Sequence, residues 1–84
     1  MNDIERGQLA EAVLKNEVFQ DAFAQINTEV FNEWQREPNE AKRNELWQLM
    51  QATKRLQTLL TQAMNNGKVE LKRQSALGRM LKLS

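Results

Sequence analysis

The sequence predicts an all-helical protein: an antiparallel hairpin of two long helices, followed by a short C-terminal helix or a flexible tail. One observation is composition, since one Pro and three Gly among abundant Leu, Gln, Glu, Lys and Ala are typical of helices. A second is the position of the only proline, Pro38, which predicts a short turn and therefore antiparallel neighbours. The third is a seam of helically spaced apolar residues within residues 43–64: Leu46, Leu49, Leu56, Leu60 and Ala63.

The first helix is predicted to begin at Asn2, because Asn2 and Glu5 have the spacing of a capping box. Its apolar stripe continues to Trp34 at helical spacing. Asn16 lies within that stripe and leaves two interpretations open. Either one helix passes through a buried or register-setting Asn16, or a short helix ends at Lys15 and another starts from Asn16.

The second helix is predicted to run from Pro38 or Asn39 to about Asn65. Asn65, Asn66 and Gly67 form a stop signal, with Gly67 placed for a left-handed C-cap. The predicted organisation is therefore a helical hairpin domain at 1–67 and a basic C-terminal tail or short helix at 68–84.

Chain length and charge together predict self-association. A chain of 84 residues forms one small domain and buries only a modest share of its surface. Residues 1–40 carry nine acidic and three basic side chains, whereas residues 41–84 carry two acidic and nine basic ones. Because an acidic helix attracts a basic one within a chain or between chains, we expect a homo-oligomer.

The chain lacks the residues that several kinds of catalytic, metal-binding and phosphate-binding sites require. The chain has no His and no Cys, and its three glycines stand alone rather than in a phosphate-binding loop. Glu29, Glu33 and Glu37 share one helical face, which we interpret as a solvated acidic surface rather than a cation site. We therefore expect no enzyme, no metal and no cofactor. No stretch resembles a signal peptide or a membrane span, so no membrane association is expected.

Two sets of residues are candidates for binding. The aromatic and apolar residues near the predicted turn and along the seam are interpreted as core or as protein interface: Trp34, Trp47, Met50, Leu56 and Leu60. The cations of the second helix and the tail are candidates for contacting nucleic acid or an anionic ligand: Lys54, Arg55, Lys68, Lys72, Arg73, Arg79 and Lys82. A face complementary to the acidic first helix explains the same cations.

The segments LKNEVFQDAF (residues 14–23) and RNELWQLM (residues 43–50), with Trp34 between them, resemble a group of small helical proteins found in tailed-phage and prophage genomes. The resemblance covers about residues 10–67 and rests on packing motifs, and the tail lies outside it. Members of the group tend to be encoded near head and packaging genes. This implies a non-enzymatic structural or assembly role in the host cytoplasm or the virion, through contacts with itself and with other phage structural proteins.

Two alternatives remain open at this point. One is a DNA-binding accessory protein, related to packaging, that uses the basic residues after position 67. The other is a phage inhibitor, or a protein that sequesters a small ligand, directed against a host defence component.

Overall fold

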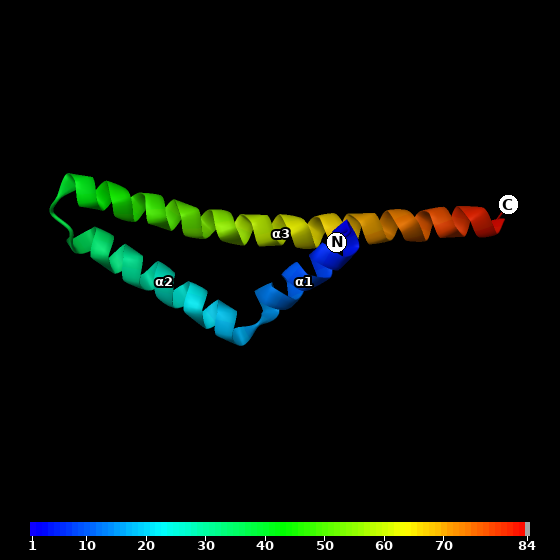
Figure 1. Ribbon diagram of the computed structural model, residues 1–84, viewed down its shortest axis with the longest axis horizontal. Helices are drawn as coiled ribbons and strands as arrows, with labels where there is room; N and C mark the ends of the chain where they lie inside the picture. Colours follow the sequence, from blue (N-terminus) through cyan, green and yellow to red (C-terminus); the bar gives the residue numbers. More distant parts are fainter. Residues whose placement is uncertain (84) are drawn as a thin grey trace. The chain divides into compact units, whose positions relative to one another are not determined.

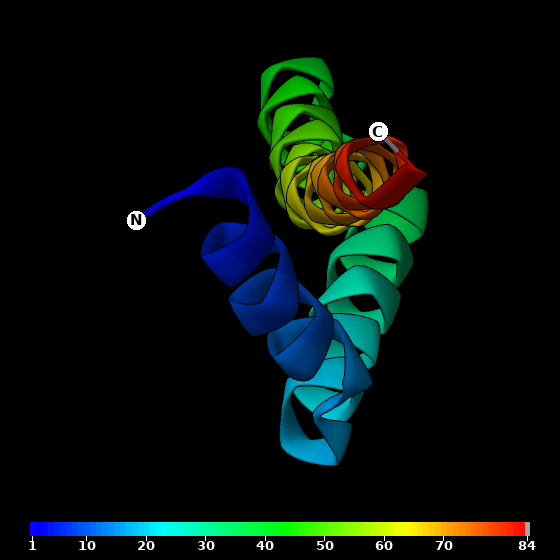
Figure 2. The same cartoon turned by 90° about the vertical axis from the view of Figure 1, so that its right-hand side faces the viewer.

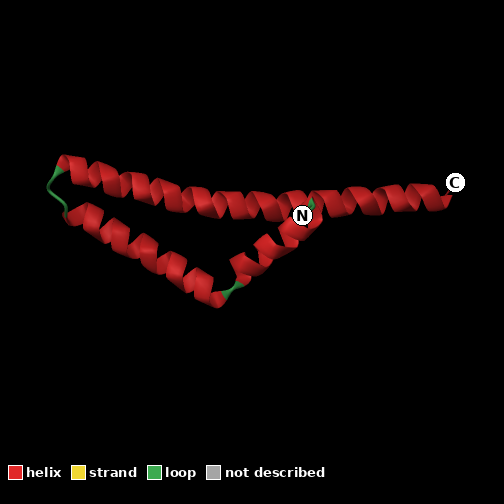
Figure 3. Ribbon diagram, viewed as in Figure 1, coloured by secondary structure: helices red, strands yellow, loops and turns green. Residues whose placement is uncertain are grey.

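The computed structural model describes residues 1–83 and is helical throughout apart from short connections (Figures 1 and 3). It contains α1 (Asp3–Lys15), α2 (Glu17–Arg36) and α3 (Glu40–Leu83). No strand occurs among the described residues, so the all-α class is confirmed.

The first predicted helix is divided at Asn16, which decides between the two interpretations (Figure 3). Asn16 has extended backbone angles, φ −71° and ψ 122°, and its side chain accepts a hydrogen bond from the backbone N–H of Phe19 at 2.9 Å. Asn2 starts α1 in the same way, accepting from the N–H of Glu5 at 2.8 Å. Each asparagine thus satisfies one of the free N–H groups that open a helix.

The predicted turn at Pro38 is present between α2 and α3. Glu37 leaves the helical conformation, with φ −79° and ψ 114°, as expected for a residue that precedes proline. The Glu37 carboxylate accepts a hydrogen bond from the N–H of Asn39 at 3.0 Å, and Asn39 in turn accepts from the N–H of Lys42 at 3.0 Å. These bonds stop one helix and start the next within three residues.

The predicted end of the second helix at Gly67 is wrong. α3 continues through Asn65, Asn66 and Gly67 to Leu83, and no described glycine has a positive φ. Gly67 instead lies against α1, where a Cβ atom added to it would be 2.8 Å from the Asp3 carbonyl oxygen and 2.9 Å from the Gly7 Cα. The absence of a side chain permits this close approach, while the helix itself is uninterrupted. The predicted boundary between a 1–67 domain and a 68–84 tail therefore falls inside α3.

Internal contacts divide the chain into two units that share α3. Unit 1 comprises Met1–Leu14 with Leu59–Ser84, and unit 2 comprises Lys15–Thr58. In unit 1, α1 contacts α3 at the two glycines, Ala10 is buried, and Lys68 Nζ lies 3.9 Å from the Glu11 carboxylate. Beyond these contacts the last turns of α3 continue past α1 (Figure 1). Figure 2 looks along these turns, which superpose as in a nearly straight helix.

Unit 2 pairs α2 with the first part of α3, and the two segments run in opposite directions after the turn (Figure 1). Val30 is its buried apolar residue, and the rings of Phe19 and Phe23 lie 5.9 Å apart on α2. Of the predicted seam, Leu46 is half-buried, whereas Leu49 and Leu56 are each 48% exposed. A hairpin formed by both full-length arms, and its oligomer, stay predictions.

Candidate interaction surfaces

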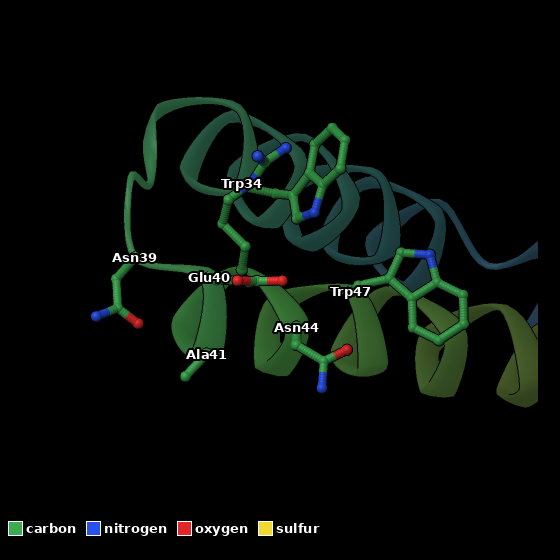
Figure 4. A pocket seen from close by; sticks show the side chains of 7 residues that line it. Trp34, Asn39, Glu40, Ala41, Asn44 and Trp47 are labelled. Carbon is green, nitrogen blue, oxygen red and sulfur yellow. The ribbon is translucent and has the colours of Figure 1, made fainter.

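Unit 2 has an open hollow at the end where the turn joins its helices (Figure 4). Its volume is about 720 Å³, and we call it the turn hollow. Figure 4 shows Trp34 on α2 above the first turns of α3, from which Trp47 projects. The lining residues are Trp34, Asn39, Glu40, Ala41, Arg43, Asn44 and Trp47.

Trp34 contacts residues of both α2 and α3 at the turn end of unit 2. Its ring stacks on Phe31 with centroids 6.1 Å apart, and the Arg43 guanidinium carbon lies 4.5 Å from the Trp34 ring centroid. A cation at this distance from an indole face is attracted by the negative face of the ring. The Nε atom of Arg43 is buried there without a hydrogen-bond partner. Trp34 is therefore mainly a packing residue, while Trp47 remains 49% exposed.

A second depression, the apolar groove, runs between α2 and α3 of unit 2 and has a volume of about 290 Å³. Thr53 is the polar side chain in it, and its hydroxyl donates to the Leu49 carbonyl at 2.9 Å, so its hydrogen-bonding need is met within α3. Ile26 and Leu56, on opposite walls, are 46% and 48% exposed. The groove is lined by Phe19, Ala22, Phe23, Ile26, Ala52, Thr53 and Leu56.

The five predicted interface residues do not form one site. Trp34 and Trp47 line the turn hollow, and Leu56 lines the apolar groove. Met50 lines a third depression with Phe31 and the predicted cation Lys54, while Leu60 belongs to unit 1. The α2 wall of the groove was not predicted from the sequence. Residues 19, 22, 23 and 26 have the helical spacing of ordinary core residues, and the sequence does not indicate that α3 leaves them partly exposed.

The predicted cations also separate. Arg55 is exposed in unit 2, whereas Lys68, Lys72, Arg73, Arg79 and Lys82 all lie on α3 in unit 1. Lys72 and Arg79 line a shallow depression of about 430 Å³ together with Leu71, Ser75 and Ala76. Arg73 forms a two-point ion pair with Glu70, with Nη2 2.6 Å and Nε 2.9 Å from the two carboxylate oxygens.

The hydrogen bonds from Arg73 lower the pKa of the Glu70 carboxyl, since they favour its charged form; the attraction of the two charges adds to this, and desolvation opposes it. The pair therefore stabilises the helix above the ordinary carboxyl pKa, and this stabilisation is lost as the pH falls through the lowered pKa.

We expect the substitution Arg73→Gln to raise the pKa of Glu70 toward its ordinary value. An NMR titration of the Glu70 side-chain carboxyl carbon measures the change. Arg79→Gln, which removes the same charge from the same helix, should leave that pKa unchanged. Equal shifts in the two variants would show that overall charge, rather than the ion pair, sets the titration.

Among residues 1–83, no group of three or more carboxylates is arranged to hold a metal ion. None of the helices described is both long and apolar enough to cross a membrane. No protein-family model matches the chain, and no curated protein or solved structure matches it significantly.

Proposed function

We propose that the protein is a non-enzymatic structural or assembly component of a tailed phage, acting through contacts with copies of itself and with other phage structural proteins. The motif resemblance of residues 10–67 supports the phage context. The observation that carries the mode of action is the apolar groove, because its exposed walls need a protein partner to remove them from water.

Exposed apolar side chains within unit 2 support self-association. Ile26, Phe31, Trp47, Leu49 and Leu56 are each 46% to 49% exposed. Burial of such side chains against a protein partner is favourable, because it removes apolar surface from water.

Charge favours one arrangement of two copies at the groove. α2 carries four carboxylates and one cation, whereas α3 as far as Thr58 carries four cations and two carboxylates. A two-fold axis parallel to the helices places α2 opposite the partner's α3, which pairs opposite charges. A two-fold axis across the helices places α2 on α2 and brings like charges together. We therefore propose the first arrangement.

Sedimentation and native mass measurement test the self-association. We expect a defined oligomer at micromolar concentration, and Leu56→Arg should raise its dissociation constant at least tenfold because a charge enters the groove. Val69→Arg, which also replaces an exposed apolar side chain of α3 with arginine but lies outside unit 2, should leave assembly intact. A stable, folded monomer of the unmodified chain would overturn the proposal.

Cysteine cross-linking tests the arrangement, and the chain has no native Cys to interfere. A mixture of Ala22→Cys and Ala52→Cys chains should form mixed disulfides, because the proposed axis brings these groove positions of different copies together. Disulfides confined to Ala22→Cys homodimers would support the other axis. Pull-downs from phage-infected cells test the biological role: recovery of phage head or packaging proteins is expected, and recovery of host proteins alone would support the inhibitor alternative.

A further inference from the structure

The continuation of α3 beyond Gly67 places four cations on one side of a single helix. At 3.6 residues per turn, Lys68, Lys72, Arg79 and Lys82 fall within about 80° of the helix circumference and span about 21 Å of its length. We call these four residues the basic face. We propose that the basic face binds the phosphate backbone of duplex DNA, a function separate from the proposed self-association at the groove of unit 2.

The structure separates the basic face from the other cation of this segment. Arg73 projects from α3 about 100° away from Lys72 and is paired with Glu70. Lys72, Arg79 and Lys82 are exposed. Lys68 is also exposed, although its Nζ lies 3.9 Å from Glu11. In the sequence, the five cations after position 67 form one undivided group. In the helix, the four cations of the basic face project to the same side and Arg73 does not.

The geometry of the face suits a row of phosphates. Ser75 lies within the same arc, between Lys72 and Arg79, and both cations line the shallow depression around it. A serine hydroxyl donates hydrogen bonds to phosphate oxygens, and lysine and arginine displace the counterions condensed on DNA. Because the last turns of α3 are nearly straight (Figure 2), the cations stay in line along the helix.

A second copy of the chain does not offer a matching acidic row. On α2, Glu17 and Asp21 share one side, while Glu29 and Glu33 lie about 120° further round the helix. The carboxylates of α1 are likewise spread around its circumference. Neither helix therefore provides a continuous acidic stripe of the required length, whereas a duplex provides phosphates at regular intervals.

Double-stranded DNA fits better than a single strand. Proteins that bind single strands without sequence preference stack the bases on aromatic side chains. The last aromatic residue in the sequence is Trp47, so the basic face has none. The expected contact is thus electrostatic and independent of base sequence.

Fluorescence anisotropy with a labelled 30-base-pair duplex tests the proposal on the full-length protein. Four phosphate contacts predict a slope of about −3.6 for the logarithm of affinity against the logarithm of salt concentration. Affinity should then fall about 150-fold between 50 and 200 mM salt. Absence of binding at 50 mM salt would overturn the proposal, as would binding only to vesicles of anionic lipid, or equal affinity for a single strand of the same length.

The double substitution Lys72→Gln with Arg79→Gln should reduce the slope to about −1.8, so that affinity falls only about 12-fold over the same salt range. Arg73→Gln is the matched control: it removes a positive charge from the same helix but not from the basic face, and its slope should equal that of the unmodified protein. Circular dichroism confirms that each variant is helical. In the double variant, each substitution is expected to reduce the salt slope by about 0.9. If Arg73→Gln alone reduces the slope by the same amount, net charge rather than the basic face causes binding, and the proposal is overturned.

Discussion

Gly67→Ala is expected to lower the free energy of unfolding by about 1 to 3 kcal/mol, the usual cost of forcing an extra carbon into a packed contact. The new Cβ would lie 2.8 Å from the carbonyl oxygen of Asp3 and 2.9 Å from the Cα of Gly7. Both are backbone atoms, so no side-chain rotation can relieve the overlap and α1 must move away from α3. Chemical denaturation at a fixed protein concentration measures the loss, and hydrogen exchange of the α1 amides shows where it occurs.

Gly78→Ala is the control, because no atom outside its own helix segment lies within 4 Å of a Cβ at that position. There the helix propensity of alanine acts alone and should stabilise the protein by about 0.5 to 1 kcal/mol. Both substitutions replace glycine with alanine, yet their effects on the free energy of unfolding should have opposite signs. If both stabilise the protein, the close approach of Gly7 and Gly67 does not hold α1 in place.

Trp34→Ala is expected to destabilise unit 2 by about 2 to 3 kcal/mol, less than for a fully buried tryptophan because Trp34 is only half-buried. The substitution removes the ring that stacks on Phe31 and the surface on which Arg43 lies. Denaturation followed by circular dichroism gives the change in stability.

Trp47→Ala tests whether Trp47 packs within the chain or lies at an interface between copies. Because Trp47 is 49% exposed, its removal should cost less than about 1 kcal/mol in the isolated chain. Any larger effect should appear only at concentrations where copies associate, as a change in assembly measured by sedimentation. Equal losses of stability from Trp34→Ala and Trp47→Ala in the dissociated chain would contradict the assignment of Trp34 as the packing residue.

Much of the local structure could be predicted because its causes lie within a few residues. Asn2, Asn16 and Asn39 each accept a hydrogen bond from an N–H three residues later, and the spacing of Asn2 and Glu5 predicts the first of these bonds from the sequence. The ring of Pro38 disfavours a helical conformation of the preceding residue, Glu37, and so places the turn there. The division at Asn16 could be stated only as one of two options, because the sequence does not show whether apolar packing carries a helix through a capping residue.

The candidate surfaces were less predictable, because they depend on which side chains α2 and α3 cover. Leu46 and Leu56 belong to the same sequence pattern, yet one is half-buried and the other forms a groove wall. Trp34 and Trp47 looked equivalent, but only Trp34 receives Arg43 on its face. Arg73 differs from the neighbouring cations because α3 continues past Gly67 and places Arg73 beside Glu70, with which it forms an ion pair.

By itself, the sequence determined the helical class, the cap at Asn2 and the turn at Pro38, since hydrogen bonds and backbone restrictions over three or four residues suffice for these. Only the tertiary structure decided the end of α3. Gly67 follows two asparagines and has every local feature of a stop, but its role is set by Gly7, which is distant in sequence and adjacent in space. The two glycines let the backbones of α1 and α3 meet, because neither carries a Cβ, and α3 continues past this contact as one helix that aligns the cations beyond it.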